Sequence, residues 1–119
     1  MLDRQQLRDF CLSRKAALAD FPFGPDPEVL KVMGRMFALL PVEADPLVLI
    51  VKCDPMLADM LRQTYPAVTA TFNKRHWNRV LVDGSIPDDE VLEMIDHSYG
   101  LVVKGLKKID RKRLEEEIT

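Results

Sequence analysis

The hydrophobic positions of this chain fall into short segments whose spacing alternates between that of helices and that of strands. The first segment is helical, because Asp3 and Gln6 have the spacing of a capping box and apolar residues then recur every three or four positions. Those apolar residues are Leu7, Phe10, Cys11 and Leu18. We therefore expect a first helix from about residue 4 to residue 15 or slightly beyond.

Five later segments are predicted to be strands, because they are short, rich in apolar or β-branched residues and bounded by turn-forming residues. They are residues 29–32, 36–40, 47–51, 68–72 and 77–82. Met33 and Gly34 lie between the first two segments, and a glycine there can adopt the positive φ of a tight turn. These two strands are therefore expected to form a hairpin.

Two further helices are expected in the second half of the chain. Asp54 can cap the first of them with Pro55 at its first position, and Pro66 ends it. Its buried positions are predicted to be Leu57, Met60, Leu61 and Tyr65. The other helix opens at Pro87, and its apolar stripe consists of Val91, Leu92, Ile95, Tyr99, Val102, Val103 and Leu106. The charged residues 108–119 are expected to be a tail or an extension of this helix.

Together these elements predict an α+β fold with a single antiparallel sheet of about five strands and helices packed on one face. Residues 1–107 are expected to form one domain, as a chain of 119 residues commonly does. Such an arrangement leaves the second face of the sheet open for binding.

The composition, with 47% hydrophobic and 30% charged residues, is that of an ordinary globular protein. No apolar run approaches the roughly 20 residues needed to span a bilayer, and the first residues lack the layout of a signal peptide. We therefore expect no membrane association and a cytoplasmic location. In a reducing compartment the two cysteines, Cys11 and Cys53, are expected to be buried thiols.

A basic and aromatic cluster directly precedes and enters the last predicted strand. Its members are Asn73, Lys74, Arg75, His76, Trp77, Asn78 and Arg79. Along a strand, Trp77 and Arg79 share one face, whereas Asn78 shares the other face with the apolar Val80 and Val82, which is therefore the expected core side. The cluster favours an anionic or planar partner, although a lone tryptophan can equally be a core anchor.

Charge is distributed unevenly along the chain. The net charge of −2 argues against a broadly basic nucleic-acid-binding protein but does not exclude a local basic patch. A second basic segment, Lys104–Arg113, contains six Lys or Arg residues and one Asp. If it continues the surface of Lys74 and Arg75, a phosphate-binding track is favoured. On the opposite side, it is a solvated helix end whose cations suit the helix dipole.

Several blocks of residues, in this order, resemble the MmcQ/YjbR family of small bacterial proteins over residues 2–107. The blocks are Phe21-Pro22-Phe23-Gly24-Pro25, the hairpin Val32–Leu39, Val51-Lys52-Cys53-Asp54-Pro55, Asn73–Asn78 and Ile95–Tyr99. The resemblance implies a fold similar to that of CyaY and DNA binding through a proposed "double wing" surface. It implies no reaction and no catalytic residues. The loop before the cluster, Thr69-Ala70-Thr71-Phe72, is shorter than the family pattern leads us to expect, and we expect this difference to alter one wing.

Two functional hypotheses follow. The first is DNA binding, in which Lys74, Arg75 and Arg79 contact phosphates, with Asn73, His76 and Asn78 as hydrogen-bonding partners and Trp77 as a stacking surface. The second is a non-enzymatic adaptor that holds an acidic protein or peptide on the open sheet face. The position of the second basic segment discriminates between them.

An enzyme is not expected, because the two histidines, His76 and His97, belong to no recognisable catalytic motif. A Cys53–His76 pair is a remote alternative, and His97 is expected on the surface or against a partner or tail. No cofactor or metal is predicted. The first helix mixes acidic and basic residues, so it lacks the acidic ridge that an iron-binding, frataxin-like protein requires.

Overall fold

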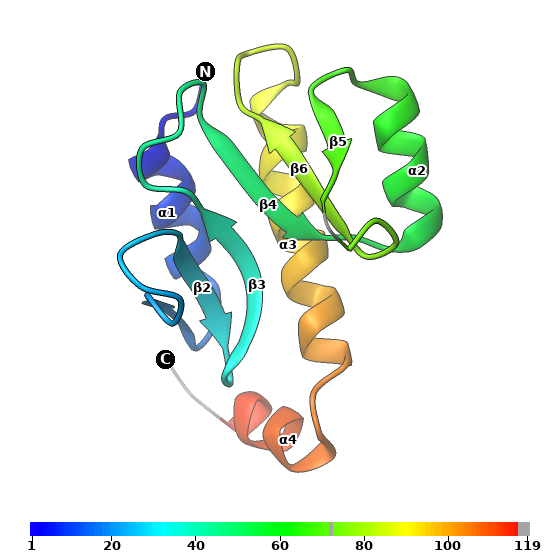
Figure 1. Cartoon of the computed structure of the whole chain (residues 1–119). Coiled ribbons are helices and arrows are strands. Elements are labelled where there is room, and N and C mark those ends of the chain that lie inside the picture. The colour runs from blue at the N-terminus through cyan, green and yellow to red at the C-terminus, as the bar shows by residue number, and fades with distance from the viewer. Residues whose placement is uncertain (72, 117–119) are drawn as a thin grey trace.

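The described part of the chain, residues 1–71 and 73–116 of a computed structural model, forms one six-stranded sheet and four helices (Figure 1). The strands are β1 (Ala17–Asp20), β2 (Glu28–Val32), β3 (Arg35–Leu40), β4 (Val48–Lys52), β5 (Val68–Ala70) and β6 (Trp77–Leu81). Their order in the sheet is β1-β2-β3-β4-β6-β5, and every neighbouring pair is antiparallel. The predicted α+β class is confirmed, with six strands in place of about five.

The helices α1 (Arg4–Leu12) and α3 (Asp88–Lys104) lie behind the sheet in Figure 1, and α2 (Pro55–Thr64) lies beside β5. All three cover the same face, since Asn78 on the inner side of β6 donates from Nδ2 to the Ala58 carbonyl of α2 at 3.4 Å. The fourth helix, α4 (Lys108–Glu116), lies below the sheet. Among the described residues, no helix is long and apolar enough to cross a membrane.

The apolar stripe of α3 is the centre of the core, as its spacing predicts. Ile95 is fully buried, and Val91 and Val102 are buried with it. Between these apolar residues lies the buried Ser98, whose hydroxyl donates to the Phe37 carbonyl of β3 at 2.5 Å and accepts from the Lys52 amide of β4 at 2.9 Å. Such a hydroxyl satisfies two backbone groups at once and fixes α3 against the middle of the sheet.

The start of the chain differs from the expectation of one long helix. The capping box of Asp3 and Gln6 is present, but α1 ends at Leu12 and the chain then reverses at Ala16, which has a φ of 58°. The following residues form β1, in which Leu18 is half exposed instead of belonging to a helical stripe. The positive φ of an alanine is a tertiary feature that residue spacing does not reveal.

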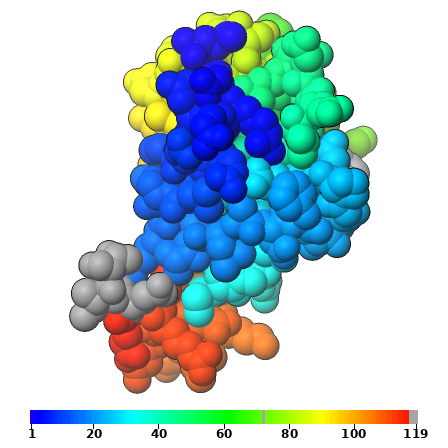
Figure 2. Space-filling view, turned by 90° about the vertical axis from the view of Figure 1, so that its left-hand side faces the viewer, coloured from blue at the N-terminus to red at the C-terminus, as the bar shows by residue number. Residues whose placement is uncertain are grey.

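The first and last helices, α1 and α4, are held to the rest of the molecule in different ways. Arg4 and Arg8 of α1 both bind the buried carboxylate of Glu28 on β2, at 2.9 and 3.0 Å. In α4, Leu114 is buried while most of its other residues are exposed. In the view of Figure 2, α1 lies in blue across the upper part of the molecule, and α4 lies in red at the bottom. Because α3 ends at Lys104 and α4 begins at Lys108, residues 108–116 form a separate helix and do not extend α3.

The prediction for α2 is partly wrong. Its N-cap is Asp54, which accepts from the Met56 and Leu57 amides, and Pro55 follows at the start of the helix, as expected. However, Met60 is 57% exposed, and the fully buried residue of the helix is Ala58. Leu57 and Leu61 are only half buried. The helix therefore covers the sheet loosely, and its predicted apolar stripe faces a space that it does not fill.

Candidate nucleic-acid interface

The register of β4 and β6 arranges the C-terminal half of the basic and aromatic cluster. Trp77 pairs with Lys52, and Arg79 pairs with Ile50. Trp77 is half buried and Arg79 is exposed, whereas Val80 and Val82 are buried. The predicted alternation is therefore confirmed, with Trp77 and Arg79 on the sheet face away from α3. The described residues include no stacking of Arg79 on Trp77; the cation–π contact they contain joins Arg14 to Phe10 at 4.2 Å.

Asn78 is the member of the cluster that faces inward. Its side chain is only 2% exposed, and its amide nitrogen is bonded to the Ala58 carbonyl. This hydrogen bond connects β6 to the middle of α2, which gives Asn78 a structural role. It does not share a surface with Trp77 and Arg79.

The remaining members, residues 73–76, form an exposed turn before β6. The amides of His76 and Trp77 both donate to the Asn73 carbonyl, at 3.3 and 3.0 Å. The His76 carbonyl in turn accepts from the Cys53 amide at 2.7 Å, which ties the turn to the end of β4. All four side chains of Asn73, Lys74, Arg75 and His76 are exposed. The turn therefore presents its cations from an anchored backbone.

A shallow depression lies between this turn and the start of α2. Lys74 and Arg75 line one side of it, and Met56 and Asp59 of α2 line the other. Arg62 spans the two sides, because its guanidinium donates both to the Ala58 carbonyl within α2 and to the Lys74 carbonyl in the turn. The turn and α2 consequently form one continuous surface, which the sequence alone does not indicate.

The second basic segment lies on a different part of the molecule. It comprises the last turn of α3 and most of α4, and Figure 1 places α4 below the sheet, whereas the turn before β6 lies at its side next to α2. Lys104 is a cation in the last turn of α3, where it suits the helix dipole. This separation favours the interpretation of the segment as a solvated helix end. By that criterion it counts against an extended phosphate-binding track and for the adaptor, so DNA binding has to rest on the residues around β6 alone.

The two thiols are not activated as nucleophiles. Burial raises the pKa of the Cys53 thiol to about 11, so it is protonated at neutral pH, and burial raises that of Cys11 to about 12. His76 is exposed and meets Cys53 through backbone atoms only. His97 is half buried, and its Nε2 accepts from the Asp54 amide at 3.3 Å, so it packs against the start of α2. Within residues 1–71 and 73–116, no group of three or more His, Cys, Asp or Glu side chains could hold a metal ion.

The comparisons with known proteins agree with this fold. The family model described as YjbR matches residues 12–101. The chain belongs to the YjbR family. It is 33% identical to YjbR of Escherichia coli K12 over 92% of this chain and 94% of that protein. It is also 33% identical to YbdF of Escherichia coli O157:H7 over 79% of each chain. Both relatives are described as uncharacterised, so they support the family and no particular activity.

Solved structures show the same YjbR-family fold. The crystal structure of Deinococcus radiodurans DR2400, described with the domain DUF419, matches with a TM-score of 0.86 and 37% identity, over 93% of this chain and 86% of that one. A crystal structure of a Pseudomonas syringae protein matches with a TM-score of 0.72 and 27% identity, over 84% of this chain and 98% of that one.

Proposed function

We propose that this YjbR-family chain binds DNA weakly, mainly through phosphate contacts, on the surface formed by Asn73–Trp77 and Arg79. The observation that carries the proposal is the shared outer face of Lys52, Trp77 and Arg79 next to the exposed Lys74 and Arg75. Lys52 and Arg79 share the outer face with Trp77, and Lys74 and Arg75 lie in the turn that directly precedes it in the chain. Cations next to an aromatic ring are the combination that binds a nucleic-acid backbone and stacks an unpaired base.

Each side chain has a distinct role in this proposal. Lys74, Arg75 and Arg79 are phosphate ligands, His76 and Asn73 are hydrogen-bonding groups, and Trp77 is the stacking surface. Asn78 is not a contact residue, because its side chain lies in the interior. With so few phosphate contacts, affinity is expected to be modest and to fall steeply as the salt concentration rises.

The chain is proposed to act without catalysis and in the cytoplasm. Its thiols have raised pKa values, and its two histidines lie apart, one exposed in the turn before β6 and one packed against the start of α2. A binding protein requires no activated group, whereas an enzyme requires a nucleophile or base held in position.

The proposal is tested by titrating short double-stranded and single-stranded DNA at several salt concentrations. We expect binding, and we expect the logarithm of the association constant to fall linearly with the logarithm of the salt concentration. Replacing Lys74 and Arg75 by Ala is expected to weaken binding for all sequences alike and to reduce that slope. The matched control removes two exposed cations elsewhere, by Lys107→Ala and Lys108→Ala, and is expected to bind as the parent does. The absence of binding at low salt, or equal losses in both double variants, contradicts the proposal.

The alternative is a module that binds an acidic protein or peptide on the same face. Phe21 and Phe23 are exposed directly after the edge strand β1, and exposed aromatic side chains are common where proteins meet; they favour a protein contact, although β1 is the sheet edge opposite to β5 and β6. A polyglutamate peptide discriminates the two functions in the same titration. Binding of the peptide with no binding of DNA supports the adaptor.

A further inference from the structure

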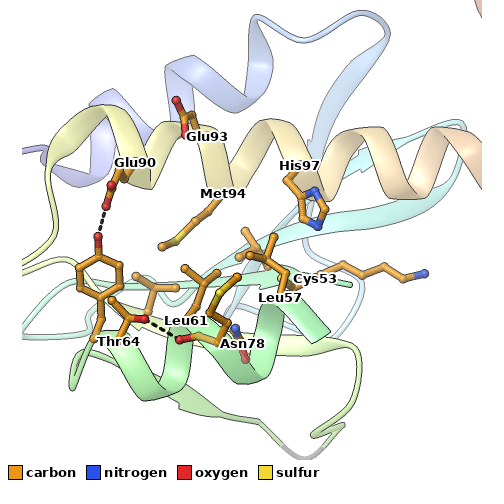
Figure 3. Close-up of a pocket in the computed structure, with 14 residues that line it drawn as sticks. Cys53, Leu57, Leu61, Thr64, Asn78, Glu90, Glu93, Met94 and His97 are labelled. Atoms are coloured by element: carbon orange, nitrogen blue, oxygen red, sulfur yellow. Dashed lines mark hydrogen bonds between the residues drawn. The ribbon is translucent and has the colours of Figure 1, made fainter. Parts of the chain in front are cut away.

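A cavity of about 410 Å³ separates α2 from α3 above β4 and β6 (Figure 3). Its walls are mainly apolar side chains of the sheet and the two helices. Those apolar residues are Val51, Leu57, Met60, Leu61, Val80 and Met94. The volume lies within the range of about 300–1,000 Å³ that is usual for sites that bind small molecules. Apart from Lys52, its lining residues lie outside the surface proposed to bind DNA.

Two polar contacts join α2 to α3 at opposite ends of this cavity. At one end, the Tyr65 hydroxyl donates to the Glu90 carboxylate, and Figure 3 shows that bond between the two elements. At the other end, His97 accepts from the Asp54 amide. Between these contacts the side chains of Leu61 and Met94 approach from opposite helices. The two helices are thus connected at both ends of the cavity, and a mainly apolar space lies between them.

The charges around the cavity are unequal at its two ends. Glu90 turns its carboxylate toward α2, whereas the exposed Glu93 points away from the cavity in Figure 3. The cation among the lining residues is Lys52, which the strand register places in the outer row of the sheet with Trp77. A carboxylate or phosphate is therefore disfavoured at the Glu90 end, whereas a cation is favoured there.

The sheet side of the cavity offers one further polar group. Asn78 lines the cavity, and its Oδ1 is buried with no hydrogen-bond partner among the described residues. The other such atoms in this part of the chain belong to Arg4 and Arg14, which do not line the cavity. The bond from Nδ2 to the Ala58 carbonyl fixes which end of the amide is the oxygen. A buried amide oxygen without a hydrogen-bond partner is unusual in a folded protein.

We propose that this cavity binds a small, mainly apolar organic molecule that carries an ammonium group, with that group at the Glu90 end. The apolar part of the molecule lies between Leu61 and Met94, where it removes apolar surface from water. The ammonium group pairs with Glu90, which keeps its hydrogen bond from Tyr65. No covalent step is involved.

Three probes with one aromatic ring and different polar groups test the proposal: phenethylammonium, phenethyl alcohol and phenylacetate. Each is titrated into the full chain while amide proton–nitrogen NMR spectra are recorded. We expect saturable shifts in residues of α2 and α3 that line the cavity, with the ammonium bound most tightly and phenylacetate least. Shifts that concentrate on residues 73–77 and on Arg79, or equal binding of all three probes, overturn the proposal.

Substitution of Glu90 by Gln separates charge from structure, because the Gln carbonyl can still accept from Tyr65. Glu90→Gln is expected to lower the affinity for phenethylammonium by about fivefold, which is the scale of a partly exposed ion pair. The affinity for phenethyl alcohol is expected to stay unchanged. Glu43→Gln removes an exposed acid from the loop between β3 and β4 and is the matched control. If Glu90→Gln lowers the affinities for the ammonium and the alcohol equally, the role of Glu90 is structural. That result overturns the proposal that an ammonium group binds at Glu90.

Filling the cavity gives an independent measurement. Leu61→Phe places a larger ring in the space between the helices and is expected to abolish binding of every probe. Thermal unfolding of the variant verifies that it is folded, and if it is not, the Glu90→Gln comparison still decides. The Lys74→Ala, Arg75→Ala double variant is expected to bind the probes normally, so a loss of DNA binding and a loss of probe binding are distinguishable. A folded Leu61→Phe variant that binds the probes as the parent does excludes the cavity as their site.

Discussion

Lys52 and Trp77 are direct cross-strand partners on β4 and β6, and both belong to the row of side chains that points away from α3. The next pair in the same ladder, Val51 and Asn78, points inward and is buried. A shift of one residue in this register would exchange the two rows and bury the cation. The outward placement of Trp77 is thus a consequence of the apolar residues that alternate with it.

This arrangement predicts which ions quench the fluorescence of Trp77, the only tryptophan in the chain. A half-buried ring near Lys52 and Arg79 lies in a positive local potential, which concentrates anions and excludes cations. We expect iodide to quench much more strongly than caesium, and we expect the difference to shrink in Lys52→Gln and at high salt. A free tryptophan amide provides the reference. Equal quenching by both ions contradicts the positive surface.

Asn73 and Asn78 have the same side chain but opposite roles. Asn78→Ala removes a buried hydrogen bond to α2 and is expected to lower the free energy of unfolding by about 1–3 kcal/mol. Asn73→Ala changes an exposed residue and is expected to alter that free energy by less than about 0.5 kcal/mol. Urea unfolding measures both. If instead Asn73→Ala is the destabilising variant, the positions of the two residues on β6 and its turn are wrong.

The phase of α3 is tested by a buried and an exposed position two residues apart. Ile95→Asp places an unpaired carboxylate in a fully buried site and is expected to lower the free energy of unfolding by more than about 4 kcal/mol. Glu93→Ala changes an exposed residue and is expected to be nearly silent. Comparable melting temperatures for the two variants would contradict the observed packing of α3.

The two buried thiols predict a loss of stability at alkaline pH. Burial raises the pKa of Cys53 to about 11 and that of Cys11 to about 12, whereas an unfolded thiol titrates near about 8.5. The folded state therefore retains protons that the unfolded state releases, so this stability is complete below about pH 8.5 and is lost as the pH rises towards the folded pKa values.

We accordingly expect the free energy of unfolding to fall from pH 8.5 to pH 10. A variant with both cysteines replaced by Ala is expected to have a shallower dependence on pH, even if it is less stable throughout. The slope is the relevant quantity, because the absolute stability also reflects the smaller side chains. Identical slopes in the two proteins would show that the thiols are not buried as described.

Much of the fold follows from local rules. The capping box of Asp3 and Gln6, the cap at Asp54, and the turn at Met33-Gly34, where both residues have positive φ, depend on residues a few positions apart. The stripe of α3 and the alternation along β6 are equally local, because burial there repeats with the period of the element. These features were predictable for that reason.

The features that escaped prediction depend on contacts between distant segments. Leu18 continues the apolar spacing of α1, so the spacing predicts a longer helix and no strand β1; the chain instead reverses at Ala16, which has a positive φ. The exposure of Met60 depends on how closely α2 approaches α3. Likewise, the contact of His97 with Asp54 and the bond of Tyr65 with Glu90 join residues far apart in the sequence. Within the basic cluster, the alternation of inward and outward residues along β6 predicts the burial of Asn78. It does not predict the hydrogen bond from Asn78 to Ala58 of α2, which joins two separate elements.

The most direct test of the account is the response of Trp77 to single-stranded DNA at low salt. If the outer surface of β6 and its preceding turn binds nucleic acid, addition of an oligothymidine quenches Trp77 emission and protects the ring from iodide. Both effects should disappear as salt is added, and they should be weakened in the Lys74→Ala, Arg75→Ala double variant but retained in Lys107→Ala, Lys108→Ala. Binding of DNA that leaves Trp77 emission and iodide access unchanged, or no binding at all, would contradict the proposed interface.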